Sequence, residues 1–148
     1  MLRLSKKADY ALISLGYLAE HGRHVVSARE IAEKCQLPLP LLMNILKVLH
    51  QRGILRSTRG ASGGYQIAAD LTELSLLELS NAVNGSAQRM PLHGAAQALQ
   101  YRLAGFMKDV SVADLVMPGR RIDVPLERVG VCKCRSEVLV TKEVLVTK

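Results

Sequence analysis

The side chains in this chain that could do chemistry are basic and amide groups, which suit binding better than catalysis. The four histidines (His21, His24, His50 and His93) are scattered, and no acid/base pair, nucleophile constellation or phosphate loop accompanies them. The 148 residues carry a formal charge of +7. Through Asp70 there are ten Lys and Arg against five Asp and Glu, so the basic excess lies in the N-terminal half. A polyanionic partner is therefore expected, and an enzyme is not.

An amide and a lysine lie on the polar face of a helix that we expect over residues 40–51. Asn44 can form two hydrogen bonds to an adenine edge, and Leu41 or Met43 can contact a thymine methyl group. Lys47 is better placed for a phosphate. The alternative for each of these is an ordinary exposed helix residue.

A glycine-rich loop, RGASGG at residues 59–64, joins two expected strands at 54–58 and 65–68. The loop lacks a GK[ST] motif and leads into a strand rather than a helix, which argues against nucleotide phosphate binding. Its glycines would let the backbone approach the wall of a DNA groove, and Arg56 and Arg59 supply charge. Because a narrow minor groove attracts arginine, we expect Arg59 in or near the minor groove.

A first helix is expected over residues 6–21, with a cluster of basic residues at its start. Ser5 is a plausible N-cap for this helix. Arg3, Lys6 and Lys7 lie together at its beginning. They are either phosphate contacts, since most protein–DNA hydrogen bonds go to the backbone, or a solvated helix end.

Two further helices are separated by a tight turn. Residues 27–30 (Ser-Ala-Arg-Glu) predict a capping box, in which each side chain satisfies a free backbone N–H of the other residue. Pro38 and Pro40 bracket the turn, and proline in the first turn of the next helix loses no hydrogen bond. Gly53 suits a left-handed stop after that helix. The stripe expected to pack inward is Leu42, Ile45, Leu46 and Leu49.

This order of elements predicts a mainly α fold with a small β wing, a winged helix-turn-helix over residues 1–85. In such a fold the second helix of the pair places its N-terminal residues against base edges in the major groove. Double-stranded DNA is therefore the expected partner. The residues expected to contact it are Arg3, Lys6, Lys7, Ser27, Arg29, Pro40, Leu41, Met43, Asn44, Lys47, Arg56, Arg59, Gly60 and Gly63.

A loop and a long helix are expected over residues 86–117. A capped helix opening at Ser75 and closing at Gly85 precedes them, and a capped helical turn at Ser111 follows. Apolar residues in the long helix alternate at spacings of four and three, which is an a/d seam. A seam this regular needs a partner helix, and a twin subunit is favoured over an intrachain partner. The expected dimer interface is Leu92, Ala96, Leu99, Leu103, Phe106 and Val110.

The remaining residues, 118–148, are expected to form an extended tail. The hexapeptide EVLVTK occurs twice in succession at its end, which is too few copies for a repeat fold. Three cysteines, an odd number, in a chain without an expected signal peptide predict a cytoplasmic protein without structural disulfides. No apolar run approaches the ~20 residues of a membrane span, so no membrane partner is expected.

Five segments are the most distinctive of the chain: MLRLSKKADYAL, SAREIAEKCQLPLPLL, RSTRGASGGYQIA, LSLLELSNAVNG and DVSVADLV. Together they resemble the Rrf-two family of bacterial winged helix-turn-helix transcriptional regulators, whose members include IscR, NsrR and CymR. The resemblance covers about residues 1–116, and its most specific element is the RG-x-x-GGY wing. It implies a homodimer that is joined by the long helix and binds pseudo-palindromic operators.

The resemblance also implies an iron–sulfur cluster, but the expected ligands are missing. Cluster-binding members carry three cysteines in the loop before the dimer helix, whereas the loop here reads GSAQRMP. Met90 falls where the last cysteine would be, and His93 where one member has its histidine ligand. Clusters are held mainly by cysteine thiolates, so one histidine is not a site. Other candidate ligands are Cys132 and Cys134, whose Cys-x-Cys spacing is a weak metal or redox signal, while Cys35 suits a packed core position.

The expected function is therefore a homodimeric, sequence-specific regulator of transcription that responds to iron–sulfur, redox or nitrosative signals. The alternative is a cluster-free winged-helix module that is controlled by a regulatory partner protein or by thiol oxidation.

Overall fold

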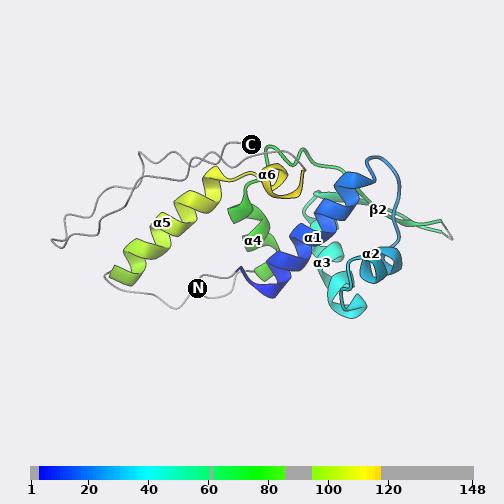
Figure 1. The fold of residues 1–148 in the computed structure, drawn as a ribbon, viewed down its shortest axis with the longest axis horizontal. Helices are drawn as coiled ribbons and strands as arrows, with labels where there is room; N and C mark the ends of the chain where they lie inside the picture. The colour runs from blue at the N-terminus through cyan, green and yellow to red at the C-terminus, as the bar shows by residue number, and fades with distance from the viewer. Residues whose placement is uncertain (1–3, 61, 86–94, 118–148) are drawn as a thin grey trace, which may run out of the picture.

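The computed structural model describes residues 4–60, 62–85 and 95–117, with the side chains of residues 95 and 96 left out. Within these ranges the chain is mainly helical with one two-stranded sheet (Figure 1). The elements are α1 (Lys6–Glu20), α2 (Ala28–Lys34), α3 (Leu39–Gln51), β1 (Leu55–Thr58), β2 (Gly64–Ile67), α4 (Leu76–Asn84), α5 (Ala95–Asp109) and α6 (Val112–Val116).

Helix α1 forms the centre of the fold. The Ser5 hydroxyl oxygen accepts a hydrogen bond from the Ala8 N–H at 3.2 Å and so caps the first turn. The helix ends one residue earlier than expected, with His21 as its C-cap and Gly22 in the left-handed region at φ +58°. Its buried face is mostly apolar, with Ala8, Ala11, Leu15 and Leu18. The buried Ser14 hydroxyl on the same face donates to the Tyr10 carbonyl at 2.6 Å.

Helices α2 and α3 form the expected helix-turn-helix. Ser27 caps α2 by accepting from the Glu30 N–H at 3.1 Å. The reciprocal half of the expected capping box is replaced, because the Glu30 carboxylate accepts from the Tyr17 hydroxyl of α1 at 3.3 Å. Gln36 occupies the turn with a positive φ of 55°, and Gly53 ends the unit at φ +75°. The predicted inward stripe of α3 is confirmed, because Leu42, Ile45, Leu46 and Leu49 are all buried.

Strands β1 and β2 form the wing as an antiparallel pair, with Leu55 opposite Ile67 and Thr58 opposite Gly64. The wing extends from the end of the molecule remote from α5 (Figure 1). Its inner end is fastened to the residues before α2, because Val26 and Tyr65 exchange both backbone hydrogen bonds, at 3.0 and 2.8 Å.

Helices α4 and α6 begin side by side, each with a complete capping box. Ser75 pairs with Glu78 and Ser111 with Asp114, and Ser75 and Ser111 form an isolated antiparallel bridge. The Leu76 N–H donates to the Val110 carbonyl at 2.9 Å. Although α6 lies beyond the boundary expected at residue 85, its Val112 and Ala113 belong to the same core as α1.

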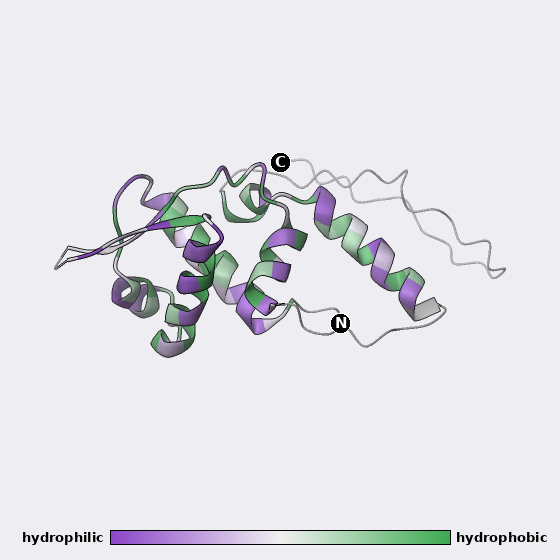
Figure 2. Cartoon of the chain, turned by 180° about the vertical axis from the view of Figure 1, so that it is seen from behind, coloured by the Kyte–Doolittle hydropathy of each residue, from purple (hydrophilic) through white to green (hydrophobic). Residues whose placement is uncertain are grey.

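Helix α5 projects from this body and touches it only at one end (Figure 1). Figure 2 shows hydrophobic and hydrophilic residues alternating along it. Leu99, Tyr101 and Phe106 are exposed by 55%, 71% and 45%. Val110, which the heptad count places in a dimer seam, is instead 3% exposed within its own chain, and its carbonyl accepts from the Leu76 N–H where α4 begins.

Several expected site residues lie outside the described ranges: Arg3, Leu92, His93, Cys132 and Cys134, as does the side chain of Ala96. No helix in the described part of the chain is long and apolar enough to cross a membrane.

Candidate nucleic-acid interface

The outward face of α3 carries the side chains that the sequence proposed for base contact. Met43, Asn44 and Lys47 are exposed, Pro40 is exposed in the first turn, and Leu41 is half-buried. They are presented outward because the opposite stripe of the helix is fixed in the core. The face therefore offers an amide, a cation and a thioether side chain to a partner in solution.

The wing adds two exposed cations, Arg56 in β1 and Arg59 at the turn that follows. Gly60 adopts a φ of +121°, which a side chain rarely tolerates, and its carbonyl accepts from the Gly63 N–H at 3.0 Å. A Cβ on Gly63 would run into the Thr58 carbonyl oxygen. These two glycines are therefore required by the tight tip that displays Arg59, as well as being candidates for contact with DNA.

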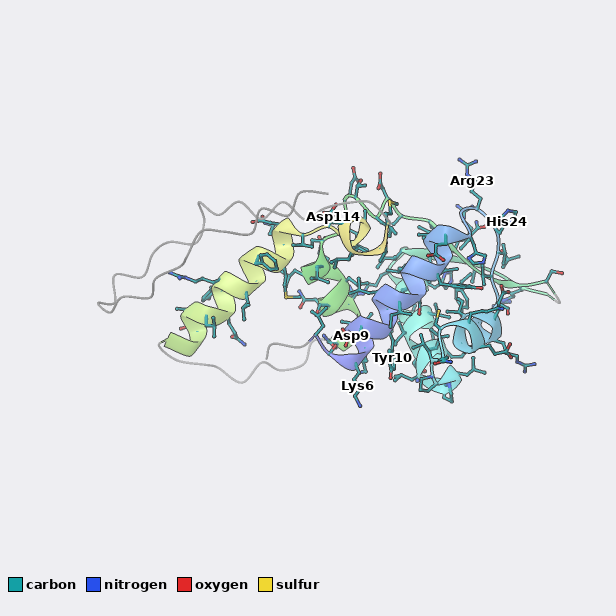
Figure 3. All side chains as sticks on the ribbon, in the orientation of Figure 1. Lys6, Asp9, Tyr10, Arg23, His24 and Asp114 are labelled. Atoms are coloured by element: carbon teal, nitrogen blue, oxygen red, sulfur yellow. The ribbon has the colours of Figure 1, made fainter. Side chains whose placement is uncertain are left out.

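The basic start of α1 lies apart from the wing. Lys6 and Lys7 are exposed, and Figure 3 shows Lys6 pointing away from the body. Arg23 and His24 point outward beyond the other end of α1. The 15 residues of α1 separate these groups by about 22 Å. The two ends of α1 are therefore too far apart to contact the same phosphate group.

The start of α2 is also held in place by side chains. Arg29 is exposed, whereas the Ser27 hydroxyl oxygen is engaged as the N-cap. Burial, together with the Glu30 carboxylate that accepts from its hydroxyl, raises the pKa of Tyr17. Tyr17 therefore remains a hydrogen-bond donor that holds the first turn of α2 against α1.

His50 is a residue of this surface that sequence reasoning missed. Its Nδ1 lies 3.1 Å from the Leu55 carbonyl oxygen and its Nε2 lies 3.3 Å from the Ser57 hydroxyl oxygen. The imidazole thus connects the last turn of α3 to β1. Nothing in the spacing of a lone histidine ahead of a glycine stop indicates such a link.

The described residues do not fit an iron–sulfur cluster. No group of three His, Cys, Asp or Glu in this part of the chain could hold a metal ion. Cys35 is its one described cysteine, and burial raises the pKa of its thiol, which disfavours the thiolate that a cluster requires. Cysteine is also absent from the sequence of residues 85–95.

Comparison with known proteins agrees with this architecture. The family model named Rrf2, described as an iron-dependent transcriptional regulator, matches residues 4–118. An HTH-type transcriptional regulator of Synechocystis is 33% identical over 101 residues, which cover 66% of this chain and 67% of that protein. IscR of Photorhabdus laumondii is 27% identical over 138 residues, which cover 83% of this chain and 84% of IscR.

A solved structure shares the fold as well. That of IscR from T. potens superimposes with a TM-score of 0.62 at 25% identity, over 76% of this chain and 85% of that one. The family match spans more than half of the sequence and includes both the helix-turn-helix and the wing. The chain therefore belongs to the Rrf2 family of transcriptional regulators, with the winged helix that such regulators use to bind DNA.

Proposed function

We propose that this protein is a homodimeric, sequence-specific regulator that occupies an operator through α3 and the wing. The observation that carries the proposal is the two-sidedness of α3. One stripe of the helix is locked in the core, the other presents Met43, Asn44 and Lys47, and a basic wing is hydrogen-bonded to the end of the same helix.

Each group has a chemical role in this proposal. The Asn44 amide offers a donor and an acceptor that match the major-groove edge of adenine, and Met43 or Leu41 meets thymine methyl groups. Lys47 and Arg29 bond to phosphates, which fixes the register on the duplex. Arg59 enters the minor groove, where a narrow stretch concentrates negative potential.

The homodimer is supported by the exposed apolar side chains of α5. Leu99 and Phe106 are separated by seven residues and so lie on one face of the helix. Burying them against a second copy of α5 would remove apolar surface from water. Two winged helices related by a dyad would then read two half-sites, a helical turn or a multiple apart.

Arg59→Ala tests the role of the wing. The probe is a duplex that the wild-type protein selects from a randomised library, and binding is followed by fluorescence anisotropy at several salt concentrations. Loss of the arginine should weaken binding by on the order of 1–3 kcal/mol and should reduce the salt slope by about one.

Arg23→Ala is the matched control, because it removes the same charge from an exposed residue outside the proposed interface. Unchanged affinity of Arg59→Ala would remove the wing from the proposal. Equal losses in the two variants would show that net charge alone is responsible.

A second candidate concerns the input signal. Because the described residues do not fit a cluster and residues 85–95 contain no cysteine, control by a partner protein or by oxidation of Cys132 and Cys134 is favoured over cluster sensing. An anaerobic absorption spectrum with iron and sulfide assays tests this candidate. A colourless, iron-free protein that still binds the selected duplex is expected, whereas charge-transfer bands with stoichiometric iron would overturn it.

A further inference from the structure

The His50 side chain forms hydrogen bonds to two residues of β1. The Leu55 carbonyl oxygen can only accept a hydrogen bond, so the Nδ1 atom 3.1 Å away is the protonated nitrogen of the neutral ring. Nε2 is then an acceptor, and the Ser57 hydroxyl donates to it across 3.3 Å. One imidazole thereby engages both the buried start and the exposed middle of the strand.

Both strands of the wing are therefore fastened, but to different elements. β2 is tied through Tyr65 to Val26, ahead of α2, by two backbone hydrogen bonds. β1 is tied to the end of α3 by His50. Ser57 lies two residues before Arg59, so the hydrogen bond from Ser57 to the imidazole is close to the tip of the wing. An isolated two-stranded hairpin is marginally stable in water, and such attachments set its orientation.

We propose that His50 is a positioning residue for DNA recognition. It holds the wing at a fixed orientation to α3, so that the Arg59 contact in the minor groove and the Asn44 contact in the major groove form together. The proposal rests on the function proposed above and adds to it a coupling between the two grooves. Without the imidazole, the wing would have to be ordered at the moment of binding, and that ordering would reduce the affinity.

The chemistry of the two contacts allows them to be separated by substitution. In His50→Asn the amide nitrogen can take the place of Nδ1 and donate to the Leu55 carbonyl. In His50→Gln the longer side chain can reach Ser57 in place of Nε2. Ser57→Ala removes the second contact from the other side and leaves α3 untouched, and His24→Ala is a control that removes an exposed histidine from the turn after α1.

The experiment measures binding of each full-length variant to the duplex that the wild-type protein selects from a randomised library. Two series of altered duplexes accompany it. Replacing thymine by uracil removes a methyl group from the major groove, and replacing adenine by 2,6-diaminopurine adds to the minor groove the amino group that guanine carries there. His50→Ala should bind the unaltered duplex about threefold to tenfold more weakly, the range expected for one or two lost hydrogen bonds.

The decisive measurements are those that separate contacts in the major groove from contacts in the minor groove. His50→Ala should keep the wild-type sensitivity to uracil but lose much of the sensitivity to diaminopurine. Arg59→Ala should weaken binding by a smaller factor in the His50→Ala background than in the wild-type protein. Asn and Gln at position 50 should each restore part of the affinity, whereas His24→Ala should match the wild type.

Two negative results are distinguishable. If the wild-type protein enriches no sequence from the library, the proposed function fails, and this inference fails with it. If a sequence is enriched but His50→Ala and Ser57→Ala keep the diaminopurine sensitivity, or combine with Arg59→Ala by simple multiplication of their effects, only the positioning role of His50 is overturned.

Discussion

At Gly64 the backbone of the wing runs close to the backbone of the residues that precede α2. A Cβ placed on Gly64 would run into the carbonyl oxygen of Val26, whose neighbour Ser27 caps α2. The same stretch of backbone exchanges two hydrogen bonds with Tyr65. The second glycine of the GGY sequence is thus needed for the junction between the wing and α2, and not for a flexible loop.

Gly64→Ala should therefore destabilise the protein by about 1–3 kcal/mol, the range for inserting a methyl group where no space exists. The change in the free energy of unfolding can be measured by urea denaturation. Gly16→Ala is the matched control, because its Cβ would meet Val116 Cβ at 3.8 Å, an ordinary contact, within the helix α1. It should stabilise the protein by roughly 0.5–1 kcal/mol. Equal effects of the two substitutions would contradict this account of Gly64.

At the residue scale, the sequence predicted what depends on near neighbours. The cap of α1 at Ser5 and the glycine stop at Gly53 span only a few residues, and both are confirmed. The prediction that the Glu30 side chain completes a capping box with Ser27 is wrong, because its carboxylate accepts from the Tyr17 hydroxyl of another helix. The link from His50 to Ser57 could not be foreseen either, because it depends on how β1 turns back along α3.

At the scale of elements, the joint between α4 and α5 contains a carboxylate whose charge is stabilised. The Ser75 backbone N–H and hydroxyl donate to Glu78 at 3.0 and 2.7 Å. These two bonds, aided by Lys108 and opposed by partial burial, hold the pKa of Glu78 below its usual range. Lys108 belongs to α5, so the interaction also connects the two helices.

This shift predicts a pH dependence that Glu78→Gln should remove. A carboxyl group with a lowered pKa in the folded state contributes stability above its unfolded pKa of about 4.3, and that contribution is lost as the pH falls through the folded pKa. The free energy of unfolding of the wild-type protein should thus exceed that of the variant. This difference should be largest near neutral pH and should shrink on acidification. Denaturation curves recorded across this range measure it.

Glu73→Gln serves as the control, because it removes the charge of an exposed glutamate just before α4. It should leave the pH profile close to that of the wild type. A difference between wild type and Glu78→Gln that stays constant with pH would refute the assigned role of Glu78.

The extents of the elements show the same division between local and distant information. The S-x-x-E and S-x-x-D sequences predicted the starts of α4 and α6, and both capping boxes are present. Heptad spacing predicted that Val110 would lie in a dimer seam, but it is buried within its own chain. The periodicity identifies an apolar face without saying which surface covers it. For Val110, the neighbouring surface is set by the bridge between Ser75 and Ser111, which joins residues far apart in sequence.

At the scale of the whole molecule, the proposed dimer makes a prediction about α5. Replacing both Leu99 and Phe106 by glutamate would place unpaired carboxylates in the proposed interface, which is strongly unfavourable. The double variant should sediment as a monomer and bind the selected duplex more weakly, because two half-sites would no longer be read as one unit.

Gln97→Glu is the matched control on the same helix. It lies nine residues before Phe106, which is about two and a half turns of the helix, and therefore on the opposite face. This variant should sediment as the wild-type protein does. A double variant that remains dimeric would show that another surface joins the subunits.

Insertions and deletions between α4 and α5 are easily accommodated by a molecule built this way. The winged-helix body includes α4, whose last residue, Asn84, accepts a hydrogen bond from the Ser5 hydroxyl, and it takes up the chain again at Ser111, which pairs with Ser75 at the start of α4. Doubling the length of a loop raises its closure free energy by only about 0.6 kcal/mol. A lineage can therefore gain or discard a set of ligands between residues 85 and 95 while α1, α3 and the wing are inherited unchanged. What such a protein senses and what it reads can evolve at different rates.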